Sequence, residues 1–123
     1  MKRLIMDLDD TICTTESGDY VNSIPNREVI DKLHFYKSIG FDIVISTSRN
    51  MRTHEGNIGK ITAQTLPVII AWLSRNNVPY DEIYVGKPWC GREGFYVDDR
   101  AIRPDEFTSL TYKEIRELIG MAP

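Results

Sequence analysis

The chain has 123 residues, of which 41% are hydrophobic and 27% are charged, and this composition predicts a single globular domain over residues 1–123. Fifteen lysine and arginine residues against eighteen aspartate and glutamate residues give a net charge of −3, which argues against a nucleic-acid partner. The apolar runs are too short to span a membrane, no signal-peptide pattern opens the chain, and Cys13 and Cys90 form no CxxC pair, so we expect a cytoplasmic protein with reduced thiols and no membrane contact.

Short apolar runs and amphipathic segments alternate along the first half of the chain. Residues 3–8 form an apolar run that ends in carboxylates, which predicts a buried strand. Residues 13–24 are polar and predict a loop or a small hairpin, after which Asn26 can cap a helix that Gly40 ends. The β-branched run at residues 41–46 predicts a second buried strand.

The second half of the chain continues this alternation. Polar residues 49–59 predict a loop, and the helix that follows is strongest over residues 67–75. Residues 82–85 and 95–97 predict a third and a fourth strand. A capping box that begins at Thr111 predicts a last helix.

Strands that alternate with helices imply a parallel sheet, because each connection must cross over the sheet before the next strand begins. With right-handed crossovers this order predicts an α/β fold, a three-layer α/β/α sandwich with a small parallel sheet of the Rossmannoid kind. Ligands of such sheets bind beyond the carboxyl ends of the strands. The residues that follow each predicted strand are therefore the candidates for chemistry.

Polar or ionisable residues follow every predicted strand. In chain order they are Asp7 and Asp9, then Thr47, Ser48 and Arg49, then Lys87, and finally Asp98 and Asp99. Four carboxylates at one edge repel each other, and Mg²⁺, which prefers carboxylate, water and phosphate oxygens, would relieve that repulsion. A hydroxyl and a lysine beside them suit a phosphoryl group.

Two carboxylates in such a site can divide the chemistry of a phosphatase. One can attack phosphorus and form an aspartyl-phosphate, and the other can protonate the leaving alkoxide and then activate water. No histidine or cysteine pair has the spacing of zinc ligands, which disfavours a zinc site.

The four strand ends resemble, in order, the four motifs of the haloacid dehalogenase (HAD) superfamily. Residues 7–11 (DLDDT) resemble its DxDxT motif, and residues 43–49 (IVISTSR) resemble its second motif. Residues 86–88 (GKP) resemble the third, and residues 95–99 (FYVDD) resemble the fourth. The resemblance covers the whole chain and implies a HAD-like fold.

The resemblance also implies a role for each residue. Asp7 would be the nucleophile and a magnesium ligand, and Asp9 would be the general acid/base with its backbone carbonyl on the metal. Thr47 would bind the transferred phosphoryl group, and Lys87 would neutralise it. Asp98 would be a direct metal ligand, and Asp99 would bind the metal through water or pair with Lys87.

Cap domains of this superfamily are inserted after the first motif or between the second and third. Here residues 11–24 can hold only a flap and residues 50–80 one loop and one helix, so we expect no cap domain. Capless members take large substrates or let a neighbouring subunit of a homo-oligomer cover the site. Residues 45–61 and 85–107 also resemble small phosphatases encoded with bacterial capsular polysaccharide biosynthesis.

Together these features predict a magnesium-dependent phosphoric monoester hydrolase of capsular polysaccharide biosynthesis. Its substrate would be a small phosphorylated metabolite, such as a sugar or polyol phosphate. The loop after the second strand would bind that substrate through Ser48, Arg49, Asn50, Arg52 and His54.

Three alternatives stay open. A phosphotransferase of the same superfamily would pass the phosphoryl group to a sugar hydroxyl, although such mutases usually need a cap. A receiver-like signalling domain has a similar length and acidic residues, but its phosphoacceptor follows the third strand and its lysine comes last. A non-catalytic protein that keeps the site as a relic would be expected to lack Asp7 or Asp9, and both are present.

Overall fold

The computed structural model describes residues 1–121, and the chain divides into two compact units, Met1–Trp89 and Cys90–Pro123. We refer to them as the N-terminal and the C-terminal unit. A division into compact units does not decide between one domain and two, so a single domain over residues 1–123 stays a prediction. Within the described residues, no helix is both long enough and apolar enough to cross a membrane.

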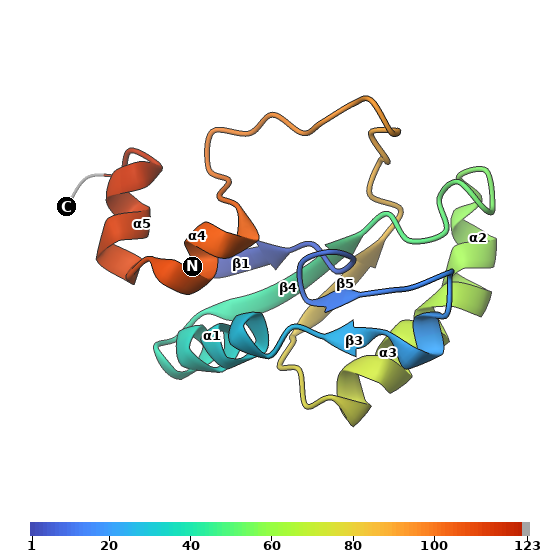
Figure 1. The fold of residues 1–123 in the computed structure, drawn as a ribbon, viewed down its shortest axis with the longest axis horizontal. Helices are drawn as coiled ribbons and strands as arrows, with labels where there is room; N and C mark the ends of the chain where they lie inside the picture. Colours follow the sequence, from blue (N-terminus) through green and yellow to red (C-terminus); the bar gives the residue numbers. More distant parts are fainter. Residues whose placement is uncertain (122–123) are drawn as a thin grey trace. The chain divides into compact units, whose positions relative to one another are not determined.

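The N-terminal unit is built on a three-stranded parallel sheet with the order β1-β4-β5 (Figure 1). Its strands are β1 (Arg3–Met6), β4 (Asp42–Thr47) and β5 (Glu82–Val85). The register pairs Met6 with Ile45 and Ile45 with Ile83, so the carboxyl ends of all three strands meet at one edge. The first three predicted strands and the α/β class are thereby confirmed.

A small antiparallel hairpin follows β1. Its strands are β2 (Cys13–Thr14) and β3 (Ile24–Pro25), and the 3₁₀ turn η1 (Tyr20–Asn22) lies between them. The indole N–H of Trp72 donates to the carbonyl of Ser23 at 2.8 Å, which ties the hairpin to a helix far along the chain. The loop or small hairpin predicted over residues 13–24 is a hairpin.

Helix α1 (Arg27–Ser38) begins and ends where the sequence predicts. The side chain of Asn26 caps it by accepting a hydrogen bond from the N–H of Val29. Gly40 has a φ of 98°, a left-handed conformation that glycine adopts without steric strain. The apolar face of this helix is buried and consists of Val29, Ile30, Leu33 and Tyr36.

The second helical stretch is longer than the predicted residues 67–75. It starts as α2 (Ile58–Lys60), passes through a π-helical turn, η2 (Ile61–Thr65), and continues as α3 (Leu66–Arg75). Pro67 has no N–H to donate to the carbonyl four residues earlier, which favours a looser helical register just before it. Apolar periodicity is weak over this first part, so the sequence indicated only α3.

Both crossover connections run in one direction, from β1 to β4 and from β4 to β5. Right-handed crossovers in one direction place their helices on the same face of the sheet, so α1 and α3 cover one face. The core lies there, and Ile43 and Ile45 of β4, Leu33 of α1 and Leu73 of α3 are all fully buried. This packing fixes the sheet edge that carries the polar residues.

The C-terminal unit holds two short helices, α4 (Pro104–Ser109) and α5 (Tyr112–Leu118). The last predicted helix is confirmed, because Thr111 caps α5 and forms a capping box with Glu114. Phe107 of α4 and Ile115 of α5 are the buried apolar side chains of the described part of this unit.

The predicted fourth strand at residues 95–97 is wrong. The described residues from 90 to 103 contain no strand, and the side chain of Val97 is 86% exposed. The run Phe-Tyr-Val has high β-propensity, but a strand exists only where its backbone pairs with another strand. The sequence of these three residues does not specify a partner strand, so their β-propensity alone does not form one.

Candidate active site

Side chains from the carboxyl ends of all three strands meet in the N-terminal unit. Asp7 directly follows β1, Thr47 is the last residue of β4, and Lys87 lies two residues beyond β5. The N–H of Lys87 donates to the carbonyl of Thr47 at 3.1 Å, and its Nζ lies 3.7 Å from Oδ1 of Asp7. The structure therefore brings these three predicted site residues together.

Gly86 forms the turn between the end of β5 and Lys87. Its φ is 83°, and a Cβ at this position would collide with the side chain of Ile58. Only glycine meets both conditions without strain, which explains its place directly before Lys87.

The carboxylate of Asp7 is suited to attack a substrate. Its side chain is 41% exposed, and its Oδ2 accepts a weak hydrogen bond from the hydroxyl of Thr11 at 3.4 Å. Burial raises the pKa of Asp7, while the positive charge of Lys87 opposes this shift by stabilising the ionised form. A reachable carboxylate beside a cation is the arrangement that carboxylate nucleophiles use.

The turn after Asp7 brings a second carboxylate to the same edge. The carbonyl of Leu8 accepts hydrogen bonds from the N–H groups of residues 11–13 at 3.3, 2.9 and 3.2 Å. Asp10 has a φ of 61°, the left-handed conformation that aspartate tolerates better than most residues. The chain therefore turns after Leu8 toward the hairpin, and Asp9 lies within this turn.

Arg49 holds Asp9 in a bidentate ion pair. Its Nη2 donates to Oδ1 of Asp9 at 2.8 Å and its Nε donates to Oδ2 at 3.1 Å. Only 1% of the Arg49 side chain is exposed, and its guanidinium carbon lies 4.2 Å from the centre of the Tyr20 ring. In this structure the predicted substrate-binding Arg49 is thus a buried partner of Asp9, and its contact with substrate stays a prediction.

Thr47 makes hydrogen bonds to the backbone of both basic residues in the site, Lys87 beside Asp7 and Arg49 beside Asp9. Its hydroxyl oxygen accepts the N–H of Arg49 at 3.0 Å, and its side chain is buried. Cys13 packs against the same group, with its Sγ 3.7 Å from both Asp9 and Arg49. Burial, with a smaller effect from Asp9, raises the pKa of Cys13 to about 11, so this thiol is not a nucleophile near neutral pH.

The other predicted substrate-binding residues lie on the loop after β4. Asn50 is in the left-handed conformation, with a φ of 60°, and its Oδ1 accepts the Thr65 hydroxyl at 2.8 Å. The guanidinium of Arg52 lies 5.8 Å from the Trp89 ring. Ser48 and His54 are half-buried and close turns of this loop through their backbone groups.

Asp98 and Asp99 lie in the C-terminal unit. Oδ1 of Asp98 accepts the N–H of Arg100 at 2.9 Å, and this bond lowers the pKa of Asp98. Among residues 1–121, no three acidic, histidine or cysteine side chains form a group that could hold a metal ion. A magnesium site built from Asp7, Asp9 and this acidic pair therefore stays a prediction.

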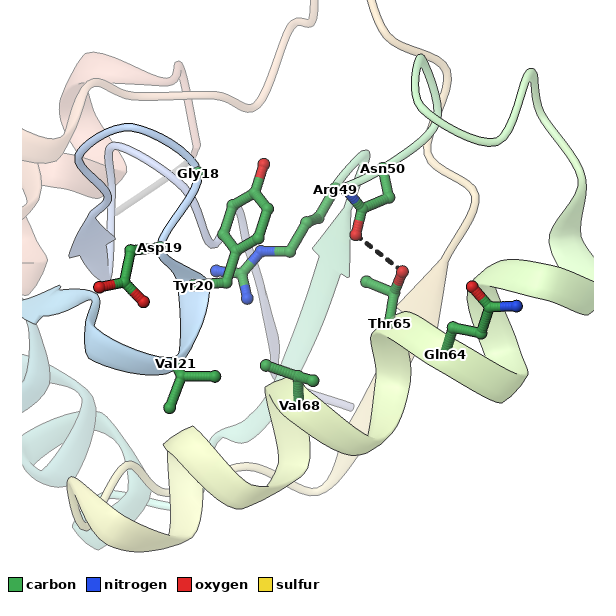
Figure 2. Close-up of a pocket in the computed structure, with 9 residues that line it drawn as sticks. All are labelled: Gly18, Asp19, Tyr20, Val21, Arg49, Asn50, Gln64, Thr65 and Val68. Atoms are coloured by element: carbon green, nitrogen blue, oxygen red, sulfur yellow. Dashed lines mark hydrogen bonds between the residues drawn. The ribbon is translucent and has the colours of Figure 1, made fainter.

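A cavity of about 200 Å³ opens beside Arg49 (Figure 2). Asp19 and Tyr20 of the hairpin lie on one side of it, and Gln64 and Thr65 of η2 lie on the other. Sequence reasoning missed these four residues because none of them follows a strand. The polar run of residues 13–24 was the only signal for the hairpin side.

A solved crystal structure, that of an MCSG target from Vibrio cholerae, is similar to this chain. The two sequences are 57% identical, the match covers 97% of each chain, and the TM-score is 0.95. The two proteins belong to one family. The α/β architecture of the N-terminal unit is therefore the fold of this family. No family model and no curated protein matches the chain.

Proposed function

We propose that the protein is a phosphatase of the haloacid dehalogenase type, which hydrolyses a small phosphorylated metabolite through an aspartyl-phosphate on Asp7. The observation that carries this proposal is the meeting of Asp7, Thr47 and Lys87 at the ends of three parallel strands. The resemblance of these strand ends to three HAD motifs supports the same roles.

Asp7 would attack phosphorus with a carboxylate oxygen, and the bond between phosphorus and the substrate alcohol would break. The ammonium group of Lys87 would offset negative charge on the transferred group. The Thr47 oxygen already accepts the N–H of Arg49, so its own proton is left to donate to a phosphoryl oxygen.

Asp9 would give a proton to the leaving alkoxide and then take one from the water that cleaves the aspartyl-phosphate. Both of its oxygens accept hydrogen bonds from Arg49. Arg49 therefore fixes the position of the Asp9 carboxyl beside the site.

Magnesium fits the donors at this edge. Asp7 offers a half-exposed carboxylate oxygen, and the pKa that burial raises would fall beside a cation. Asp7 and the backbone carbonyl of Asp9 are the groups at this edge that would hold it, and the resemblance adds Asp98 and Asp99 to the set. When bound, the ion would neutralise charge on the phosphoryl group.

We extend this proposal to the complete fold and to the cellular role of the protein. The protein would be a capless three-layer sandwich, and exposed Ile5 and Tyr84 on the sheet face opposite α1 and α3 support a second covering layer. The resemblance to capsule phosphatases supports a cytoplasmic role in capsular polysaccharide biosynthesis. In the proposed capless protein, a second subunit would cover the site in place of a cap domain.

The proposal is tested by hydrolysis of para-nitrophenyl phosphate with Mg²⁺ and after treatment with EDTA. We expect turnover with Mg²⁺, loss of turnover on chelation, and a weak response to Ca²⁺, whose looser coordination suits the reaction poorly. Acid quenching followed by mass spectrometry should find phosphate on the peptide that contains Asp7. Turnover that survives complete chelation, or phosphate on another residue, would contradict the proposal.

A further inference from the structure

The cavity beside Arg49 adjoins the acid/base side of the proposed site. Arg49 both pairs with Asp9 and lines the cavity, so it connects the two (Figure 2). A phosphate ester bound at Asp7 needs room for its alcohol half near the residue that protonates the leaving oxygen. The lining of this cavity includes Arg49, the partner of Asp9, but neither Asp7 nor Asp9 itself, so Arg49 is the link between the cavity and the proposed site.

The charges around the cavity disfavour a second anionic group. The guanidinium of Arg49 is already matched by the carboxylate of Asp9. The cavity lining contains no other cationic side chain, and Asp19 adds a negative charge. A neutral ligand therefore suits the cavity better than a carboxylate or a second phosphate.

The size of the cavity limits the ligand to a small molecule. Its volume is about 200 Å³. A group of about the size of one sugar ring or a short polyol fits this volume.

The hydrogen-bonding groups around the cavity match hydroxyls. The amide of Gln64 and the hydroxyl of Tyr20 make no hydrogen bond within residues 1–121, so both are open to a ligand. Thr65 donates to Asn50 at 2.8 Å, which leaves its oxygen to accept. The side chains thus offer both donors and acceptors, as a polyhydroxylated group requires.

The guanidinium itself contains a further donor. Nη1 of Arg49 is buried and has no hydrogen-bond partner in the described structure. A buried donor without a partner is destabilising, and an acceptor oxygen beside the guanidinium would relieve that penalty. The Tyr20 ring lies beside this group, with its centre 4.2 Å from the guanidinium carbon.

From these observations we infer that the cavity is the subsite for the alcohol half of the substrate and that it binds a neutral sugar or polyol group. The inference rests on the proposed phosphatase function and names the substrate class of that site. Gln64, Thr65 and Tyr20 become specificity-determining residues that the motifs do not contain.

The test compares kcat/KM for a polyhydroxylated ester and for an ester without hydroxyls. Glucose 6-phosphate, glucitol 6-phosphate and glycerol 3-phosphate are the first kind, and para-nitrophenyl phosphate is the second. For the best of the three, Gln64→Ala should raise KM about 2- to 10-fold, the effect of one neutral hydrogen bond, with kcat nearly unchanged. Hydrolysis of the aryl ester should not change.

Thr62→Ala is the matched control, because Thr62 is exposed on the same π-helical turn and does not line the cavity. It should leave both kinds of substrate unaffected. Thr65→Val should act like Gln64→Ala, and Thr65→Ser, which keeps the hydroxyl, should restore the wild-type KM. Losses of equal size on both kinds of ester, or no loss on either, would overturn the inference.

A binding measurement separates failure of the subsite from failure of the proposed function. If no ester is hydrolysed, the proposed function fails, and saturation-transfer NMR with free glucose and free glucitol then decides the inference. Saturation transfer that weakens in Gln64→Ala and persists in Thr62→Ala would support the subsite. Its absence in the wild-type protein would overturn it.

Discussion

The two ends of the same three-stranded sheet carry similar residues but arrange them differently. Both ends combine aspartates with a lysine and an arginine. At the amino ends of the strands Asp81 and Glu82 form short pairs with Lys37 and Arg3. At the carboxyl ends a short pair between Asp9 and Arg49 lies beside a looser 3.7 Å contact between Asp7 and Lys87, and Nη1 of Arg49 has no hydrogen-bond partner among the described residues. The comparison separates charges that stabilise the fold from charges that are available for chemistry.

At the amino ends, Asp81 is the centre of a closed network. Both of its oxygens accept from the Nζ of Lys37, at 2.7 and 2.8 Å, and one also accepts the N–H of Ile43 at 2.8 Å. These bonds lower the pKa of Asp81 and raise that of Lys37. Arg3 and Glu82, the first residues of β1 and β5, pair at 3.0 Å.

At the carboxyl ends, the Lys87 ammonium lies 3.7 Å from Asp7, and burial raises the pKa of Asp7. Nη1 of Arg49 is buried without a hydrogen-bond partner among the described residues. The raised pKa of Asp7 and the unpartnered Nη1 of Arg49 both mean that the carboxyl ends of the strands contribute less to the stability of the fold than fully paired groups would. A ligand with oxygen atoms and negative charge would supply the missing partners of these groups. Groups with perturbed pKa values and unfilled hydrogen bonds are typical of functional sites.

The largest expected effect comes from Asp7→Asn. The amide cannot attack phosphorus, so hydrolysis should fall by on the order of 10³-fold or more. The melting temperature should stay close to that of the wild type, because Asp7 has no short ion pair to lose. Asp10→Asn, an exposed change in the same turn, is the control and should keep full activity.

Asp9→Asn should have the next largest effect, and it should depend on the leaving group. Alkyl phosphates should lose ~10²–10⁴-fold in rate, because an alkoxide needs a proton, whereas aryl phosphates should lose much less. Single-turnover rates for an alkyl and an aryl ester measure the ratio. Equal losses would assign Asp9 a role other than proton transfer.

Asp81→Ala breaks the network at the amino ends and should lower stability without lowering activity. We expect a loss of about 1 kcal/mol, from one backbone hydrogen bond and a partly exposed ion pair. The folded-state pKa of Asp81 is lowered, so its contribution is present above the ordinary aspartate pKa and is lost as the pH falls through the folded-state value.

Urea denaturation at pH 7 and at pH 3 measures this difference. The gap between wild type and Asp81→Ala should narrow at the lower pH. Asp42→Ala is the matched control, because Asp42 is more exposed and lies 3.8 Å from the same lysine. A larger loss from Asp42 than from Asp81 would contradict the closed network.

The smallest expected effect concerns Cys13, which packs beside Asp9 and Arg49. Its thiol is buried and its pKa is raised to about 11, so iodoacetamide at pH 8 should leave Cys13 unmodified in the folded protein. Half-buried Cys90 should react first. Mass spectrometry locates the label, and rapid labelling of Cys13 would show that this side of the site opens.

The sequence predicted those parts of the site that depend on local patterns. Asp7, Thr47 and Lys87 each follow an apolar run, and parallel pairing brings such positions to one edge. The pair between Asp9 and Arg49 joins residues far apart in the chain, and no spacing rule connects them. The same holds for Tyr20 and Thr65, whose common cavity exists only after the hairpin packs beside η2.

Local patterns also produced the error at residues 95–97. Phe95, Tyr96 and Val97 favour a strand individually, but strand formation depends on a partner that their own sequence does not specify. The cap of α1 at Asn26 shows the opposite case. Its hydrogen bond joins residues three apart, so the sequence alone was sufficient.

The bond between the Lys87 N–H and the Thr47 carbonyl has a consequence for changes in chain length. Inserting one residue between residues 82 and 86 would shift the alternation of β5 and turn Lys87 away from Asp7. An insertion at Asn77, in the turn before β5 where φ is 54°, would be absorbed outside the sheet. Length variation within this family should therefore be tolerated before Asp81 and excluded between Glu82 and Lys87.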